Sequence, residues 1–188
     1  MWRDQIRARA YTTNDTMEPK NLIIRKAAPS DEPFLREMLY HSLYVPDGSV
    51  PFDRDILTRP EIAKYVEGWG RAGDLGLIAV DSCSGEAVGA VWIRIFKGSE
   101  KGYGYVSDNT PELGIAVLPE HRGCGVGSAL LQRLVEVAGT TYDAVSLSVS
   151  TNNPAVRLYE RVGFERVETR GNSTTMLKWL KSRPAPTA

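Results

Sequence analysis

The 188-residue sequence contains few of the residues that bind metals or form disulfides. Its cysteines are Cys83 and Cys124, its histidines are His41 and His121, and their spacing matches no zinc motif. Two cysteines also make no disulfide framework, which favours a reducing compartment. We therefore expect a cytoplasmic protein without a metal cofactor.

An excess of charge of one sign and a long hydrophobic run are also absent. Lys and Arg number 23, as do Asp and Glu, so net charge does not draw the protein toward nucleic acid or an anionic membrane. No apolar segment approaches the roughly 18 residues that span a bilayer, and the basic N-terminal stretch is not followed by the hydrophobic segment of a signal peptide. We expect neither nucleic acid nor a membrane as a partner.

The length and the 42% hydrophobic content are typical of one compact domain with its own core. We place this domain at residues 21–181. Residues 1–20 are predicted to be a flexible tail, with a transit peptide as the alternative because arginine and threonine are frequent there. The proline-rich residues 182–188 are predicted to be a loose tail as well.

Hydrophobic periodicity and turn residues predict an alternation of strands and helices. The predicted strands cover residues 22–27, 74–81, 87–96, 112–117, 144–150, 164–169 and 174–180. The predicted helices are one capped by Ser30 and ending near Tyr44, one at residues 60–70, one running to residue 138, and one capped by Asn153 and ended by Gly163. This order indicates a mixed sheet covered by helices.

A glycine-rich loop follows the strand at residues 112–117. Gly123, Gly125 and Gly127 alternate after Arg122 and lead directly into a helical pattern. The first N–H groups of a helix lack intrahelical partners, and small residues leave them open to an anion. The loop therefore favours a phosphate or pyrophosphate site, and the alternative is a tight turn without a ligand.

Two common phosphate-binding motifs fit this loop poorly. The Gly-Lys-Ser or Gly-Lys-Thr of a P-loop is absent from the sequence. The dinucleotide fingerprint requires glycine where Ser128 stands, although Asp143 lies at a suitable distance for its acidic residue. A dinucleotide-binding protein remains an alternative.

The segment AVLPEHRGCGVGSALL resembles the acyl-CoA-binding motif of the GNAT superfamily of N-acyltransferases. The motif Arg/Gln-x-x-Gly-x-Gly/Ala is matched by Arg122, Gly125 and Gly127. The later segment NNPAVRLYERVGF resembles a second motif of the family, matched by Asn152, Ala155, Tyr159, Gly163 and Phe164. The resemblance extends over nearly all of the chain between the two predicted tails.

This resemblance implies an α/β (α+β) fold, with a mixed, largely antiparallel sheet of about six to seven strands and helices on both faces. It also implies a splayed parallel pair of strands at the cofactor site and acetyl-CoA as the acyl donor. The cofactor-binding residues that it implies are Ile115, Val117, Arg122, Gly123, Cys124, Gly125, Val126, Gly127, Ser128 and Asn152. The pantetheine would pair with the backbone of Ile115 and Val117 like an added strand.

The implied reaction is transfer of an acetyl group to a primary amine by direct attack in a ternary complex. An amine of pKa near 10.4 is neutral in only about one molecule in a thousand at pH 7, so a base would help. Glu112 lies at about the place where many members of the family carry a glutamate base. The alternative is an exposed carboxylate at a strand edge, and Asp108 is a weaker second candidate.

Tyr159 matches the tyrosine that assists the departing thiolate in the family, and ordinary packing on a helical face is its alternative role. Cys124 would lie under the pyrophosphate, far from the thioester, and is not predicted to be a nucleophile. We expect His121 to be a solvated loop residue.

The acceptor amine is not identified by any motif. Residues 40–74 contain aromatic and acidic residues that fit either an amine pocket or core aromatics with a solvated rim. They are Tyr40, Tyr44, Phe52, Tyr65, Trp69, Asp47, Asp53, Asp55 and Glu67. A small molecule or a peptide remains open as the acceptor, and the resemblance is compatible with a homodimer. A CoA-binding sensor module without catalysis is the alternative function.

Overall fold

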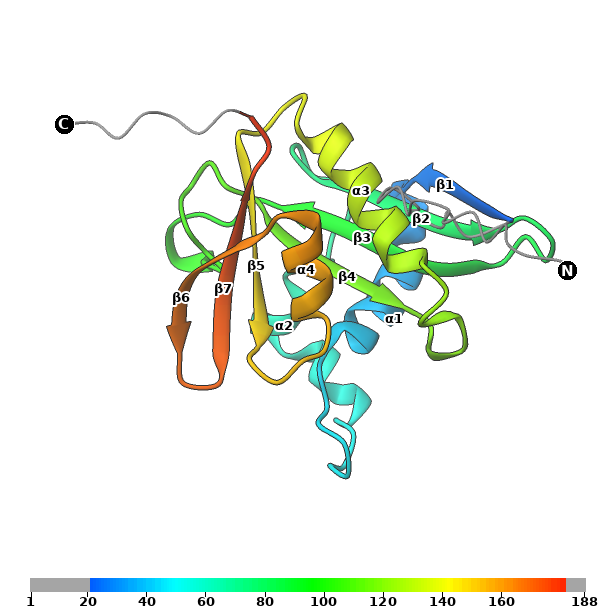
Figure 1. Cartoon of the computed structure of the whole chain (residues 1–188), viewed down its shortest axis with the longest axis horizontal. Helices are drawn as coiled ribbons and strands as arrows, with labels where there is room; N and C mark the ends of the chain where they lie inside the picture. The colour runs from blue at the N-terminus through cyan, green and yellow to red at the C-terminus, as the bar shows by residue number, and fades with distance from the viewer. Residues whose placement is uncertain (1–20, 182–188) are drawn as a thin grey trace, which may run out of the picture.

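The computed structural model describes residues 21–181. The two predicted tails, residues 1–20 and 182–188, lie outside the described residues. The described chain contains a seven-stranded sheet in the order β1-β2-β3-β4-β5-β7-β6 (Figure 1). The strands are β1 Leu22–Lys26, β2 Leu75–Asp81, β3 Ala87–Arg94, β4 Glu112–Val117, β5 Ala144–Ser150, β6 Glu165–Arg170 and β7 Ser173–Trp179.

Neighbouring strands run antiparallel except for β4 and β5, which are parallel. Short turns join β2 to β3 and β6 to β7, as antiparallel neighbours permit. A helix lies between β4 and β5 in the chain, because two parallel strands need a crossover connection. The sheet confirms the predicted mixed, largely antiparallel architecture with a parallel pair.

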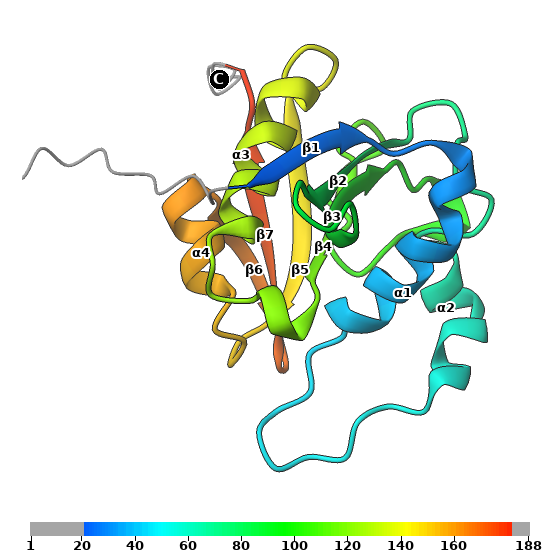
Figure 2. The same cartoon turned by 90° about the vertical axis from the view of Figure 1, so that its right-hand side faces the viewer.

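Helices cover both faces of the sheet, as predicted. In Figure 2, α1 (Glu32–Ser42) and α2 (Pro60–Ala63) lie on one side, and α3 (Val126–Ala138) and α4 (Val156–Val162) lie on the other. Each pair of helices buries its own apolar cluster against the sheet. The pleat of each strand places alternate side chains in alternate clusters.

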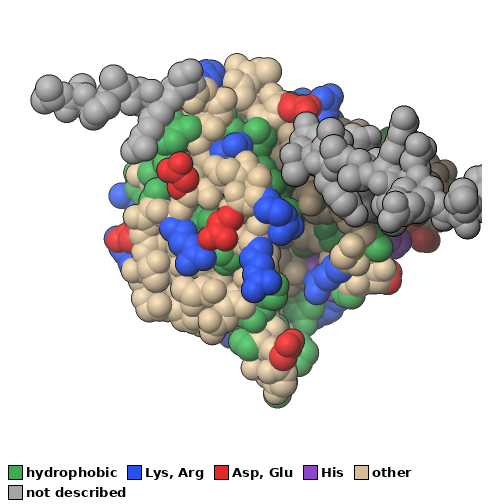
Figure 3. Space-filling model, viewed as in Figure 1, with side chains coloured by type: hydrophobic (Ala, Val, Ile, Leu, Met, Phe, Trp, Pro, Cys, Tyr) green, Lys and Arg blue, Asp and Glu red, His purple; other side chains and the backbone are tan. Residues whose placement is uncertain are grey.

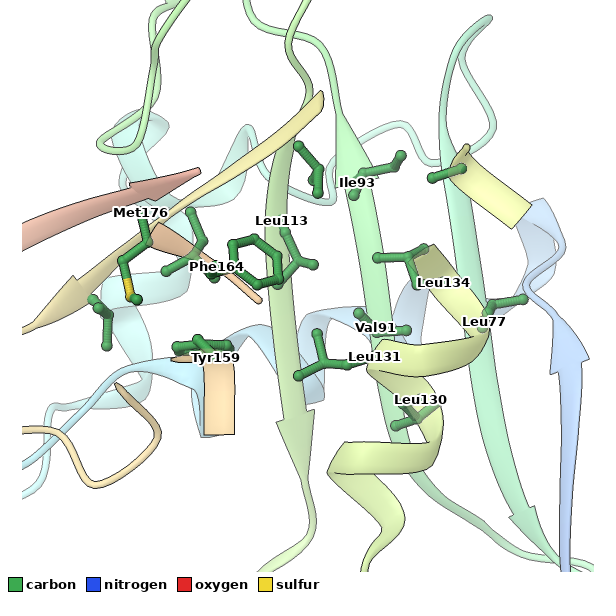
Figure 4. Packing of buried hydrophobic residues seen from close by; sticks show 14 of the residues in the cluster. Leu77, Val91, Ile93, Leu113, Leu130, Leu131, Leu134, Tyr159, Phe164 and Met176 are labelled. Carbon is green, nitrogen blue, oxygen red and sulfur yellow. The ribbon is translucent and has the colours of Figure 1, made fainter. Parts of the chain in front are cut away.

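The core beneath α3 follows from the spacing of its leucines. Leu130, Leu131 and Leu134 recur at intervals of one and three residues, lie on one helical face and are fully buried. Figure 4 shows these side chains directed toward Val91 of β3 and Leu77 of β2. This packing holds α3, and with it the preceding glycine-rich loop, against the middle of the sheet.

The first helix differs from its prediction at both ends. Asp31, not Ser30, is its N-cap, because a short 3-10 helix over Pro29–Asp31 precedes α1. The Asp31 carboxylate does not cap α1 but accepts hydrogen bonds from the Ala28 N–H at 2.7 Å and from the Arg25 guanidinium. The helix ends at Ser42, two residues before the expected end at Tyr44. A proline at position 46 disfavours helical backbone just before it.

The second helix is much shorter than predicted. A helix was expected over residues 60–70, but α2 ends at Ala63 and turns follow it. Arg94 Nη1 donates to the carbonyl oxygens of Lys64 at 2.6 Å and Glu67 at 2.9 Å. These carbonyls are therefore used by a strand side chain, which comes from far away in the sequence.

Charged side chains of both signs lie interspersed on the face shown in Figure 3. Several form exposed ion pairs, such as Arg166 with Glu160 and Arg133 with Glu136. Exposed pairs of this kind each contribute only about 0–1 kcal/mol to stability.

Candidate active site

Two neighbouring strands separate at the centre of the sheet. β4 and β5 share the single register pair Glu112–Ser146, and the Ser146 N–H donates to Pro111 O at 3.0 Å. Beyond this pair the two parallel strands splay. A cavity of about 300 Å³ lies here, lined by Glu112, Gly114 and Trp92 from one face of the sheet and by Ile115 and Leu147 from the other. The splay thus opens the sheet from face to face.

Glu112 is the first residue of β4, and its side chain is only 4% exposed. Its Oε1 accepts a hydrogen bond of 2.7 Å from the Tyr65 hydroxyl. Its Oε2 is buried and makes no hydrogen bond of good geometry within residues 21–181. The alternative of an exposed carboxylate at a strand edge is therefore wrong.

The pKa of Glu112 is raised above its ordinary value. Burial is the largest cause, because removal from water disfavours the charged carboxylate. The Tyr65 hydroxyl, the Gly104 amide and the Lys64 ammonium act in the opposite direction by favouring the charged form. Such a carboxyl group has a pKa closer to the neutral range in which a general base works best.

Tyr159 lines the same cavity from the other side of the sheet. Its ring lies on α4 and packs edge-to-face against Phe164, with ring centroids 5.9 Å apart. Burial raises the pKa of Tyr159 to about 12, so its hydroxyl stays protonated at neutral pH. The residue therefore combines the predicted core packing with a hydroxyl group at the cavity.

The glycine-rich loop adopts a conformation that few other residues tolerate. Gly123 and Gly125 have positive φ angles of 76° and 83°, and Gly125 is the N-cap of α3. A Cβ atom added to Gly123 would meet no atom within 4 Å. A Cβ atom at Gly127 would lie 3.4 Å from Leu158. The loop thus leaves open space beside the first amides of a 13-residue helix.

The predicted backbone sites on β4 face the splay. The Leu118 N–H donates to Val88 O, and the alternation of the β3–β4 ladder then directs the backbone groups of Ile115 and Val117 away from β3. Val117 O nevertheless accepts a hydrogen bond of 3.0 Å from Arg122 Nε. The Arg122 side chain thus lies along the end of β4 instead of extending freely at the rim of the glycine loop.

The other predicted cofactor residues do not line the cavity. Cys124 is exposed, and Val126 is buried as the first residue of α3. Ser128 lies in the first turn of this helix. Asn152 is exposed, and its backbone oxygen accepts a hydrogen bond of 3.2 Å from the Tyr44 hydroxyl.

The aromatic and acidic residues of the expected acceptor pocket separate in the structure. Tyr44, Phe52 and Tyr65 line the cavity. Trp69 is 6% exposed and packs in the core, where its ring faces Arg94. None of the four acidic residues named for this pocket lines the cavity; they are Asp47, Asp53, Asp55 and Glu67. Among the residues that line it, Glu112 is the only carboxylate.

Asp108, the second candidate base, lies outside the cavity. It is exposed, and its Oδ1 accepts a hydrogen bond of 2.8 Å from the Tyr105 hydroxyl. His121 is in a short 3-10 helix before the glycine-rich loop.

Sequence reasoning missed the role of three residues at the site. Tyr65 was assigned only to a general aromatic group, and neither Trp92 nor Tyr103 was singled out. Trp92 Nε1 is buried without a hydrogen-bond partner within residues 21–181 and belongs to a residue lining the cavity. No local pattern reveals these contacts, because the residues meet Glu112 and Gly114 only through the sheet register and a loop crossing.

Membrane-spanning helices and clusters of metal-binding side chains are both absent from residues 21–181. No helix within this range is long and apolar enough to cross a membrane. No group of three or more His, Cys, Asp or Glu side chains within it is arranged to hold a metal ion.

Curated relatives match limited segments of the chain. The [ribosomal protein bS18]-alanine N-acetyltransferase of Haemophilus influenzae is 37% identical over 68 residues, which are 36% of this chain and 47% of the relative. An N-alpha-acetyltransferase of Sulfurisphaera tokodaii is 42% identical over 57 residues, or 29% of this chain and 34% of the relative. The chain thus spans less than half the length of these relatives.

Solved structures share the fold over most of the chain. The putative acetyltransferase yncA from Salmonella typhimurium, solved with its cofactor acetyl-CoA, has a TM-score of 0.62 and 22% identity, covering 89% of this chain and 99% of that one. The ribosomal-protein-alanine N-acetyltransferase of Brucella melitensis has a TM-score of 0.58 and 22% identity, with coverage of 84% and 99%.

A family model extends from the first helix to the end of α4. The model described as the acetyltransferase (GNAT) family matches residues 36–164, well over half of the chain. This match includes the glycine-rich loop, the splayed strands and the tyrosine of α4. The chain therefore belongs to the acetyltransferase (GNAT) family.

Proposed function

We propose that this protein is an N-acetyltransferase that moves an acetyl group from acetyl-CoA to a primary amine by direct attack in a ternary complex. One observation carries the proposal: the buried Glu112 carboxyl group and the Tyr159 hydroxyl group line one cavity at the splay of β4 and β5. Membership of the family and the similarity to a structure solved with acetyl-CoA support it.

The glycine-rich loop is the proposed site of the CoA pyrophosphate. The open space at Gly123 and the free amides at the start of α3 suit an anion, and the helix dipole favours negative charge there. The backbone groups of Ile115 and Val117 would pair with the pantetheine amides. Pairing at Val117 O would require Arg122 Nε to release or share this oxygen.

Glu112 is the proposed general base. The acceptor is mostly an ammonium ion at neutral pH, so one of its protons first passes to the Glu112 carboxylate, directly or through water. The neutral amine nitrogen then attacks the thioester carbonyl carbon. The C–S bond then breaks, so that an amide and the CoA thiolate form. Glu112 returns its proton to solvent, and the thiolate takes one up.

Tyr159 is proposed to stabilise the departing thiolate by a hydrogen bond. Its pKa of about 12 lies above the roughly 8.5 of a thiol, so complete transfer of its proton to sulfur is unfavourable. A donated hydrogen bond spreads the negative charge without this transfer. The phenol is therefore assigned as a hydrogen-bond donor that stays protonated.

The cavity favours an acceptor with one amine and an apolar neighbourhood. Its walls include Phe52, Tyr44 and Leu43, whereas Glu112 is its only carboxylate. A compound with several positive charges would find a single counter-charge there. Some relatives act on ribosomal protein alanine and some solved neighbours on spermidine; the charge of the cavity supports the peptide α-amine more than the polyamine.

The homodimer, with which the family resemblance is compatible, stays a prediction.

Release of free thiol from acetyl-CoA tests the proposal. Purified protein is incubated with a panel of peptides with free N-termini, aromatic monoamines and polyamines. We expect turnover with peptides or monoamines. Binding of acetyl-CoA without turnover on any amine would instead support the non-catalytic sensor module.

The cofactor site is tested by binding. Acetyl-CoA should raise the melting temperature, whereas NAD should not. Gly125→Val should abolish the shift, because valine at a φ of 83° is strained and covers the amides. Gly171→Val is the matched control, since Gly171 also has a positive φ of 56° but lies in the β6–β7 turn. A normal shift in Gly125→Val would place the phosphate site elsewhere.

A further inference from the structure

The hydroxyl group of Tyr65 joins three segments that are distant in the sequence. It donates to Glu112 Oε1 at 2.7 Å and accepts a hydrogen bond of 2.8 Å from the Tyr103 N–H. The ring is 8% exposed and packs against Phe96, with ring centroids 4.9 Å apart. The hydroxyl thus has both a donor and an acceptor contact within a buried site.

We propose that Tyr65 is a positioning residue that holds the Glu112 carboxylate in the orientation and charge state required for accepting a proton from the acceptor amine. The inference rests on the proposed function, in which Glu112 is the base. It is carried by the two hydrogen bonds of Tyr65, its burial and its place in the cavity wall.

The surroundings of Glu112 make this contact decisive for its orientation. A methyl group at Gly102 would collide with both Glu112 Oε2 and the Tyr65 hydroxyl, so the loop backbone lies tightly against the carboxyl group. Oε2 makes no hydrogen bond of good geometry, and Tyr65 provides the side-chain hydrogen bond on Oε1. Loss of this bond would leave a buried carboxylate oxygen without its side-chain hydrogen-bond partner.

The charged and titratable groups near Glu112 come from the segments packed around it. Lys64, just after α2, favours the charged carboxylate. Arg94 is its register partner in β3, but the Arg94 guanidinium forms a buried ion pair of 2.7 Å with Asp74. Tyr103 contributes an exposed ring stacked on Tyr65. Tyr65 is therefore the direct hydrogen-bond partner among these groups.

Removal of the Tyr65 hydroxyl has an effect of known sign. The hydroxyl stabilises the ionised form of Glu112, so its loss should raise the pKa of Glu112 further. A charge-assisted hydrogen bond contributes enough to move a pKa by about one unit. The acidic limb of the pH–rate profile, which requires ionised Glu112, should move to higher pH by the same amount.

The first experiment measures the carboxyl group directly. The ¹³C chemical shift of the Glu112 carboxyl carbon is titrated in wild type and in Tyr65→Phe, with Glu112→Gln used to assign the signal. We expect the midpoint in Tyr65→Phe to rise by about one pH unit. An unchanged midpoint in a folded Tyr65→Phe protein would overturn the proposal. This readout does not require turnover, so it separates the inference from the proposed function.

The second experiment follows kcat/KM against pH with the best acceptor amine. We expect Tyr65→Phe to move the acidic limb to higher pH and to lower kcat on the plateau, with little change in KM for acetyl-CoA. Tyr105→Phe is the matched control, because it removes a phenol that also donates to a carboxylate but lies outside the cavity. Its limb and plateau should match wild type.

A double variant tests whether Tyr65 acts through Glu112 or only supports the fold. In the Glu112→Gln background, Tyr65→Phe should lower the rate by less than twofold, because its target is already gone. An equal loss in both backgrounds, or a lower plateau with an unmoved acidic limb, would mean that Tyr65 only supports the fold.

Discussion

Two tyrosine–carboxylate hydrogen bonds of nearly equal length involve carboxylates that are close together in the chain, Asp108 and Glu112. Tyr65 donates to Glu112 at 2.7 Å, and Tyr105 donates to Asp108 at 2.8 Å. The first pair is buried beside the splay of β4 and β5, whereas the second is exposed to solvent. The pairs thus share their chemistry and differ in their surroundings.

Burial changes how much the same kind of hydrogen bond determines the pKa values of the paired groups. Burial is the main cause that raises the pKa of both Glu112 and Tyr65, while the hydrogen bond to Asp108 is the main cause that raises the pKa of Tyr105. Water can replace a lost partner at the exposed pair but not at the buried one. A functional carboxylate is therefore identified here by its desolvation and its place in a cavity more than by its partner.

The largest expected effect is on turnover. Glu112→Gln should lower kcat/KM by about 10²- to 10⁴-fold at neutral pH, the usual contribution of a general base. The loss should shrink as pH approaches the pKa of the acceptor, because more amine is then neutral. Asp108→Asn should stay within twofold of wild type at every pH.

The opposite ranking of the two carboxylate variants would break the comparison. If Glu112→Gln kept the full wild-type rate, Glu112 would not be the general base. In that outcome, a water chain or the solvent would have to accept the proton.

A third tyrosine sharpens the contrast, because Tyr159 is buried in the cavity wall without a carboxylate partner. Tyr159→Phe should lower kcat by about tenfold or more at every pH below about 12, since its only lost function is hydrogen bonding to the thiolate. The binding of CoA should change little, because the ring remains. Thiol release at several pH values, with CoA binding measured by calorimetry, provides the check.

The smallest expected effect concerns stability. The folded pKa of Glu112 is raised, so the unfolded chain loses this proton first as pH rises above about 4.3. Wild type should therefore lose stability relative to Glu112→Gln between about pH 4 and pH 7, by about 1.4 kcal/mol for each unit of pKa shift. Urea unfolding at the two pH values measures this difference.

Asp108→Asn is the reference in the same unfolding series. It should differ from wild type by less than about 0.5 kcal/mol at both pH values, as exposed substitutions usually do. A constant difference between wild type and Glu112→Gln across the window would contradict the raised pKa of Glu112.

Several features were accessible from local sequence patterns. The alternation of Val145, Leu147 and Val149 with serines predicts a strand, and these residues are buried in β5. Gly163 was predicted to end a helix, and it does so with a φ of 91°. Such signals act within a few residues, so each segment carries them by itself.

Other features depended on contacts between distant residues. The sequence predicts a helix over residues 60–70, but α2 ends at Ala63. The Arg94 side chain binds the carbonyl oxygens of Lys64 and Glu67, which follow α2. The acidic residues grouped with the aromatics by proximity in the chain lie outside the cavity. Proximity along a loop does not decide the direction of a side chain, because packing against other elements selects it.

The sequence by itself determined the order of strands and helices, the glycine-rich helix start and the family resemblance. These depend on periodicity, backbone freedom and short motifs, which are local properties. Tertiary structure alone decided which carboxylate is desolvated. Only three residues lie between Asp108 and Glu112 in the chain, yet of these two carboxylates only Glu112 is buried between a strand pair, a loop and Tyr65. Desolvation and pairing depend on segments far away in the sequence, which no local pattern contains.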